Sequence, residues 1–315
     1  MRWTRTRTTL LALTVMICAC PAKGAGQADI TAPRVGETRV VPTTFLPDPF
    51  INTKVSLGLG YGKSSNILTP LLEIEGDPIL GLEGDLLYLI LDFEYKYAVR
   101  EWVAVWARIR VAGRLGNEIQ SILAQGVNAA TGFELGWLFR LYETDRHYLS
   151  TGISVRNGSA TLVDILGWAN GIIEDEEVGL IWKSPTLGTV GEMHYAYAAN
   201  DFTALQFLGQ LSYSETVIRA TNNEWYYGLG GLVSFDLAKR TDAPVGLALG
   251  YKYTTIPEGG DEIAEGTHAV LVGLSYMGRP DFSIGLDLEF QKVPLKGLDD
   301  PAKFFTATIS SQYFF

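Results

Sequence analysis

Strict two-residue alternation of apolar and polar side chains is the feature that most constrains how this chain can fold. Residues 84–98 show it most clearly, because one face carries Asp92, Glu94 and Lys96 while the other face is entirely apolar or aromatic. That second face consists of Leu87, Leu89, Leu91, Phe93, Tyr95 and Tyr97. Successive side chains of a β-strand point to opposite faces, so the pattern predicts a long strand with one apolar face.

The alternation returns about a dozen times along the chain. Most of these segments are roughly twice the five or six residues of an ordinary soluble strand, and they match the roughly 9 to 11 residues of a tilted membrane strand. A soluble β-sandwich is the main alternative, but its second face would have to be covered or polar. We therefore predict an all-β fold, a transmembrane antiparallel up-and-down β-barrel of about twelve strands, with short periplasmic turns and longer extracellular loops. The strands are expected near residues 51–62, 84–98, 102–114, 130–143, 147–157, 189–199, 203–216, 225–238, 244–255, 267–277, 281–293 and 303–315.

Residues 1–24 have the pattern of a secretory signal peptide. Three arginines among the first seven residues precede an apolar run from Leu10 to Cys18, and small residues follow. Cleavage by signal peptidase near residue 24 and lipidation at Cys20 both remain open. Both cysteines lie in this segment, so no disulfide or thiol chemistry is predicted for the mature chain.

The chain ends in Ser311, Gln312, Tyr313, Phe314 and Phe315. Together with the leader and the alternation, this ending resembles the outer-membrane β-barrel class of Gram-negative bacteria, without pointing to one porin or transporter family. The resemblance implies that Tyr313 and Phe315 form an assembly signal for the barrel assembly machinery. It also implies an outer-membrane location, among membrane lipid and lipopolysaccharide.

Three regions follow from these observations. Residues 1–24 are the predicted signal peptide and residues 51–315 the barrel. Residues 25–50 contain Pro33, Pro42, Pro47 and Pro49 and read as neither strand nor helix. We expect this segment to be a periplasmic tether or a partial plug of the barrel.

The polar faces of the strands predict which side chains line the interior. Arginines gather on the third to fifth predicted strands and acids on the eleventh, which would set a transverse field across a pore. The same charges could instead pair between neighbouring strands, as Asp92 and Glu94 could with Arg108 and Arg110. The predicted pore-lining residues are Asp92, Glu94, Arg108, Arg110, Arg140, Arg156, Glu192, His194, Lys252, Asp287 and Glu289.

Two outer loops carry helix-like periodicity, at residues 117–123 and 159–173. An apolar helix in a surface loop must bury its face, either as a constriction folded into the mouth of the barrel or against the rim and lipopolysaccharide. The candidate constriction residues are Leu162, Ile165, Leu166, Trp168 and Ile172.

An enzyme is the less favoured interpretation. Twelve-stranded barrels resemble both narrow channels and the outer-membrane phospholipase, but none of His147, His194 and His268 has a serine two residues later, the spacing favoured by lipid-modifying barrels of that kind. A nonlocal pair of His194 with Ser154, Ser212 or Ser214 stays geometrically possible. No His or Cys cluster has zinc-ligand spacing, so no metal or other cofactor is predicted.

The sequence thus predicts a channel or substrate-selective transporter for passive diffusion of a small-molecule solute. A closed structural or surface-interaction barrel is the alternative, and a lipid hydrolase comes after it. The net charge of −10 makes nucleic acid an unexpected partner. The solute and the oligomeric state do not follow from the sequence.

Overall fold

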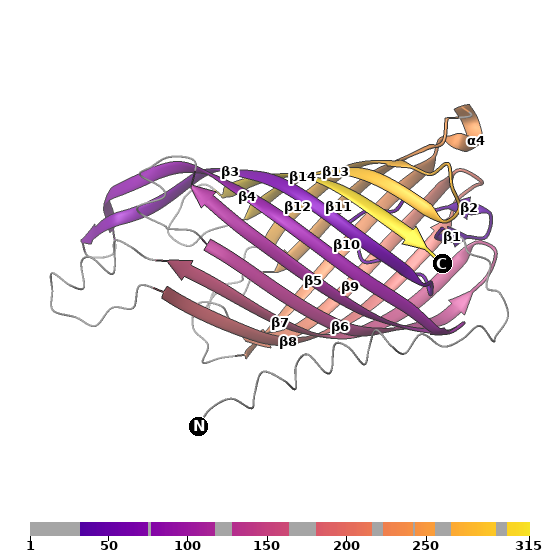
Figure 1. The fold of residues 1–315 in the computed structure, drawn as a ribbon, viewed down its shortest axis with the longest axis horizontal. Helices are drawn as coiled ribbons and strands as arrows, with labels where there is room; N and C mark the ends of the chain where they lie inside the picture. The colour runs from indigo at the N-terminus through magenta and orange to yellow at the C-terminus, as the bar shows by residue number, and fades with distance from the viewer. Residues whose placement is uncertain are drawn as a thin grey trace, which may run out of the picture. The chain divides into compact units, whose positions relative to one another are not determined.

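A computed structural model describes residues 32–74, 77–116, 128–163, 181–215, 223–241, 243–255, 266–293 and 301–315. Twelve strands, β3 to β14, form a closed antiparallel barrel in which each strand pairs with its neighbours in the sequence and β14 closes the ring against β3. The strands are strongly tilted (Figure 1). Within the described ranges, no helix is long and apolar enough to cross a membrane.

The predicted barrel, its antiparallel order and its twelve strands are confirmed. A small two-stranded sheet and one short helix, α4 (Ala238–Thr241), complete the described elements. The small sheet pairs β1 (Arg34–Val35) with β2 (Thr38–Arg39). The barrel strands are β3 (Lys54–Ile74), β4 (Asp77–Arg100), β5 (Val103–Gly116), β6 (Asn128–Glu143), β7 (His147–Val163), β8 (Ile181–Ala198), β9 (Thr203–Glu215), β10 (Asn223–Asp236), β11 (Val245–Thr255), β12 (Gly266–Tyr276), β13 (Phe282–Val293) and β14 (Ala302–Phe314).

Several strands are longer than the sequence predicted. The ladder between β3 and β4 continues as far as the pair Ile74 and Asp77, and Figure 1 shows this hairpin extending beyond the other strands. β7 continues to Val163, so residues 159–163, where a helix was expected to begin, form strand instead. Leu162 pairs with Trp182 of β8 instead of lying in a constriction helix, because the hydrogen-bonded ladder to β8 outweighs the local periodicity. Ile165, Leu166, Trp168, Ile172 and residues 117–123 lie outside the described residues.

The outward face of the barrel is apolar, as the alternation predicts. Leu89 is 55% exposed and Leu91 42% exposed, whereas Glu94 and Lys96 of the same strand are buried on the inward face. Aromatic rings gather outside near both ends, as Tyr213 beside Trp225 at one end and Tyr195 beside Phe207 at the other. An apolar band between two aromatic belts is the pattern of a membrane barrel.

The C-terminal strand also keeps the predicted faces. Tyr313 and Phe315 are each about half exposed on the outer surface, while Phe314 between them is buried. The Phe315 amide donates a hydrogen bond to the carbonyl of Thr53, the residue just before β3. The last residue therefore takes part in closing the ring.

Candidate functional site

Residues 32–52, called the inner segment from here on, lie inside the barrel. They contact side chains from β4, β7, β12 and β13 by hydrogen bonds and from β10 and β11 by apolar packing, so strands surround them on all sides. Figure 1 shows β1 and β2 at the end that carries the C-terminus. The Ala32 amide donates to the Pro280 carbonyl and Thr38 Oγ1 donates to the Asn200 carbonyl, and both acceptors belong to short turns. The inner segment therefore fills the short-turn end of the barrel.

The turn between β1 and β2 requires glycine at one position. Gly36 has a φ of +58°, a conformation that residues with a Cβ rarely adopt. The position of a Cβ on Gly36 would also coincide with the Asp145 backbone, in the turn between β6 and β7. Glycine lets the inner segment lie directly against the barrel wall there.

Apolar side chains of the inner segment pack in two clusters against inward-facing residues of the barrel. Val41, Phe45 and Leu46 form one cluster with wall residues that include Leu232 and Leu271. The second cluster joins Val35, Val40 and Phe50 to Tyr148, Ala196, Ala198 and Ala204. All of these side chains are at least nine-tenths buried. Burial of this apolar surface favours the docked position of the inner segment.

Polar contacts fix the register of the inner segment against the wall. The Thr44 amide and hydroxyl both donate to Asp287 Oδ2, at 2.7 and 2.8 Å. The hydroxyls of Ser150 and Ser275 donate to the carbonyls of Pro49 and Pro42, at 2.7 and 3.0 Å. Prolines keep their carbonyl acceptors although they have no amide donor. These contacts bind the segment to opposite walls of the barrel.

A buried charge cluster joins the inner segment to β3 and β4. Asp48 Oδ2 lies 3.1 Å from both Lys54 Nζ and Lys96 Nζ. Lys54 Nζ lies 3.1 Å from Glu94 Oε1, and Lys96 Nζ also donates to the carbonyls of Asp48 and Phe50. Burial by itself would raise the pKa of Asp48, but the two ammonium groups and the hydrogen bonds from Asn52 and the Phe50 amide hold that pKa well below its ordinary value. Asp48 is therefore ionised when the segment is docked.

A small cavity of about 20 Å³, called the polar chamber, lies directly against the inner segment. Its described lining residues are Pro47, Asp48, Glu94, Lys96, Trp106, Arg108, Leu138, Arg156, Glu192 and His194. The charged groups are paired: Lys96 with Asp48, Arg108 with Glu94, and Arg156 with Glu192 at 3.5 Å. Arg156 also contacts Glu134 at 2.6 Å.

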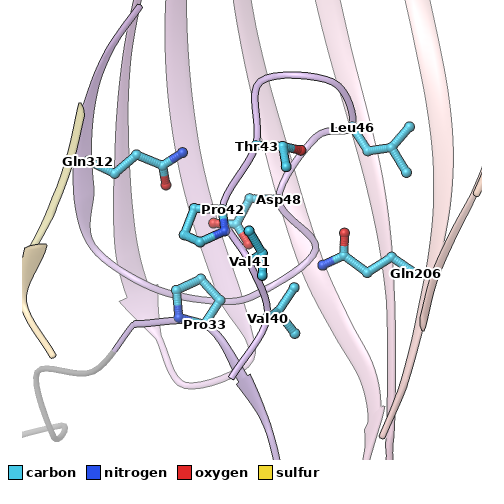
Figure 2. Close-up of a pocket in the computed structure, with 9 residues that line it drawn as sticks. All are labelled: Pro33, Val40, Val41, Pro42, Thr43, Leu46, Asp48, Gln206 and Gln312. Carbon is cyan, nitrogen blue, oxygen red and sulfur yellow. The ribbon is translucent and has the colours of Figure 1, made fainter. Parts of the chain in front are cut away.

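A second small cavity, of about 20 Å³, lies between the inner segment and two glutamines of the wall (Figure 2). Gln206 of β9 and Gln312 of β14 reach toward the segment from different sides of the barrel, and Val41 and Pro42 lie between them. The inner segment thus crosses the interior as a loop, and the two cavities beside it each have room for about one water molecule.

The structure brings five of the predicted pore-lining residues together in the polar chamber: Glu94, Arg108, Arg156, Glu192 and His194. The predicted pairing across the hairpin is found, because Arg108 contacts Glu94 and Arg110 Nη2 lies 2.6 Å from Asp92 Oδ2. Ion pairs on this side of the barrel cancel much of the charge that a transverse field would need.

The remaining predicted lining residues lie elsewhere. Arg140 pairs with Glu143 near a short turn, and Asp287 binds Thr44 of the inner segment. Lys252 of β11 and Glu289 of β13 are inward-facing but outside the described lining of the chamber.

The proposed Ser–His pair is not formed by Ser154. Its hydroxyl donates to Glu134 Oε1 at 2.6 Å, while His194 Nε2 lies 3.3 Å from Glu192 Oε2. His194 faces Leu208 of β9, so Ser212 and Ser214 lie four and six residues farther along that strand, at least about 13 Å away. Among the described residues, no group of three or more His, Cys, Asp or Glu side chains could hold a metal ion.

Sequence reasoning missed several residues of this site. Asp48 lies in a segment without periodicity, and nothing in the sequence links it to Lys54 and Lys96. Lys96 and Glu134 did stand on predicted inward faces, and Trp106 shared the inward face of Arg108. These three could have been included from the alternation alone.

No family model matches this chain, and no curated protein matches it either. Among solved structures, an outer-membrane channel from Pseudomonas putida F1 has 13% sequence identity and a TM-score of 0.50, over 93% of this chain and 100% of that one. The translocator domain of the autotransporter NalP from Neisseria meningitidis has 10% identity and a TM-score of 0.51, over 84% of this chain and 90% of that one. The fold of this chain is therefore that of the outer-membrane β-barrel proteins.

Proposed function

We propose that this protein is an outer-membrane channel for the passive diffusion of small solutes, with the inner segment acting as its plug. One observation carries the proposal: a separate chain segment, rather than strand side chains alone, fills the short-turn end of the barrel interior, and it contacts charged inward-facing side chains of the wall. Twelve strands enclose more space than the eight of a barrel that its own side chains can fill. A polar interior inside an apolar outer band suits the passage of water-soluble molecules.

Orientation and export follow from the same proposal. Short turns face the periplasm and long connections face outward, so the plug occupies the periplasmic half of the pore. Residues 1–24 are the export signal, and Tyr313 with Phe315 is read by the barrel assembly machinery. Of the two alternatives for residues 25–50, a periplasmic tether or a partial plug, the contacts of residues 32–50 with the barrel wall support the plug.

A closed structural barrel is the second candidate, and a specific observation favours it. The two apolar clusters and the buried charges of Asp48, Lys54 and Lys96 anchor the inner segment at many points. A segment held in this way could block the barrel permanently.

Planar-bilayer recording separates the two candidates. The full chain and a variant lacking residues 33–50 are refolded, and the heat-dependent shift in gel mobility verifies that each barrel is closed. We expect brief, small openings from the full chain and steady, larger conductance from the deletion variant, because the plug no longer obstructs the pore. If neither folded protein conducts, the closed structural barrel is the better interpretation. If both conduct equally, the inner segment is not a plug.

A further inference from the structure

We propose that the outer surface of β12, β13 and β14, at the end opposite the short turns, binds the phosphorylated headgroup of lipopolysaccharide. The site, called the basic row, consists of His268, Lys292 and Lys303. The inference rests on the proposed orientation, with the long connections facing outward. It does not depend on whether the barrel conducts.

The strand register places these three basic side chains next to one another. His268 is directly opposite Lys292 in the ladder between β12 and β13, and Lys292 is directly opposite Lys303 in the ladder between β13 and β14. All three side chains are exposed. They share the outward face with Phe290 and Phe305, whose ring centroids are 4.9 Å apart. The basic row therefore crosses three adjacent strands on the lipid-facing side.

Such a row is unfavourable unless an anion lies against it. The Cβ atoms of directly opposite residues are about 4.5–5.5 Å apart, and like charges in this arrangement destabilise a sheet. Within the described ranges, neither Lys292 nor Lys303 has an ion-pair or hydrogen-bond partner. A phosphate group beside the two ammonium groups would accept charge-assisted hydrogen bonds from both and compensate their charge.

His268 extends the row and is held in place by two tyrosines. Its Nδ1 atom lies 2.7 Å from Tyr251 Oη, and its ring centroid lies 5.1 Å from that of Tyr253. The hydrogen bond at Nδ1 leaves Nε2 as the ring nitrogen available to a ligand. Tyrosine is enriched where a membrane protein passes from hydrocarbon to headgroups. The surroundings of His268 are therefore those of the interface.

The depth of the basic row matches the headgroup layer. Lys303 precedes Phe315 by twelve residues on the last strand. At about 3.3 Å per residue and a strand tilt of about 40°, this separation is about 30 Å along the membrane normal. The apolar band of an outer-membrane barrel is about 25 Å tall. With Phe315 at the short-turn edge of this band, Lys303 lies just beyond its outer edge.

The bases gather on one arc of the ring. Lys63 of β3 is exposed on the same outward face, opposite Phe305. Toward the corresponding ends of β6, β7, β9 and β10, the described outward side chains include no base. They include Thr131, Asn157, Tyr213 and Trp225, which are exposed and uncharged. This asymmetry favours a lipid bound at one place over a uniform attraction around the barrel.

The width of the row favours lipopolysaccharide over a phospholipid with a single phosphate. From β12 to β14 the row spans two interstrand spacings, which is about 10 Å. A single phosphate group is narrower than this, whereas the lipid A part of lipopolysaccharide carries a phosphate at each end of its disaccharide. Clusters of basic residues beside the hydrocarbon are a general means of recognising anionic headgroups.

Native mass spectrometry of the refolded full chain in non-ionic detergent tests the site. The probes are lipid A with both phosphates, lipid A from which both have been removed, and phosphatidylglycerol. We expect the diphosphorylated lipid A to bind most tightly. The double variant Lys292→Gln with Lys303→Gln should weaken this binding by about 30-fold, the effect of two lysines near an anionic headgroup. Its binding of dephosphorylated lipid A should be unchanged.

Arg146→Gln with Lys239→Gln is the matched control, because it removes the same charge from two exposed side chains at the short-turn end. It should leave lipid A binding unchanged, and heat-dependent gel mobility verifies that each variant folds. Equal losses in the two double variants, equal binding of lipid A with and without phosphates, or tighter binding of phosphatidylglycerol would each overturn the inference. Lipid A binding by a barrel that does not conduct would refute the channel and leave the site, whereas conductance without lipid A binding would refute the site alone.

Discussion

Asp48 shows how one residue of an irregular segment can determine where that segment lies. Its carboxylate is the shared partner of Lys54 and Lys96, whose side chains are each 4% exposed. Glu94 compensates Lys54 from the other side, so removal of the Asp48 charge leaves two ammonium groups with one nearby carboxylate. The docked position of the inner segment is therefore linked to the ionisation of a single group.

This linkage predicts how the plug responds to pH. The pKa of Asp48 in the docked state lies below its ordinary value of 3.8, so the stabilisation is fully present above pH 3.8 and is lost as the pH falls toward the lowered pKa. We expect the plug to stay docked from pH 5 to 8 and single-channel conductance to rise only well below pH 4. In Asp48→Asn, conductance at pH 7 should already be raised and should lose this dependence. Opening of the wild type between pH 5 and 7 would contradict the prediction.

At the scale of elements, the inner segment and the strands β10 and β11 have complementary surfaces. Inward glycines on these strands leave room where the segment is bulky: a Cβ on Gly250 would lie 2.8 Å from Phe45, and one on Gly230 would lie 2.7 Å from Leu46. Gly246 likewise faces Val41. Glycine weakens a strand, so three inward glycines beside the segment are best explained by the space that the segment occupies.

Gly250→Val should therefore displace the segment without opening the barrel. A valine side chain would overlap the Phe45 ring, and overpacking of this kind costs about 1–3 kcal/mol. We expect faster proteolysis of residues 32–52 and increased conductance. Gly228→Val is the matched control, since the contacts of a Cβ at Gly228 are with wall residues at 3.4 Å or more. Equal effects of the two substitutions would attribute them to the strands rather than to the segment.

At the scale of the whole molecule, the closed ring leaves no unpaired strand edge between β3 and β14. Backbone groups in a bilayer need such closure because lipid offers no hydrogen bonds. The apolar side chains that surround the ring then become the surface that meets the membrane. An exposed apolar band around a water-soluble protein would instead cause aggregation.

A charge placed on this band should destabilise the barrel according to its depth. Leu91 lies outward near the middle of the membrane-facing part of β4, and Tyr97 lies nearer the short-turn end. In guanidinium unfolding from lipid vesicles, we expect Leu91→Arg to lower the free energy of unfolding by about 2–4 kcal/mol and Tyr97→Arg by about 1 kcal/mol or less. Equal losses at both positions would argue against this placement in the bilayer.

The sequence by itself determined the barrel, its strand number and the faces of its strands. The apolar and polar residues alternate with a period of two, and successive side chains of a pleated strand point to opposite faces with the same period. The sequence of each strand therefore shows which side chains meet lipid. The neighbouring order β3 to β14 then allows ion pairs such as Arg110 with Asp92 to be predicted, because adjacent strands are also adjacent in the chain. The ends of the strands were predicted less well. Leu162 lies in a segment with helical periodicity, but it is part of β7 because it pairs with β8.

Only the tertiary structure decided where residues 32–52 lie and what they close. Their side chains follow no period, and their partners are far away in the chain, as with Thr44 and Asp287 or Val41 and Leu271. Inward leucines and glycines have no evident purpose in isolated strands, because their role depends on what fills the ring. The physical reason is that a strand pattern records burial on two faces, whereas a site inside a barrel depends on distances across it, which exist only once the ring has closed.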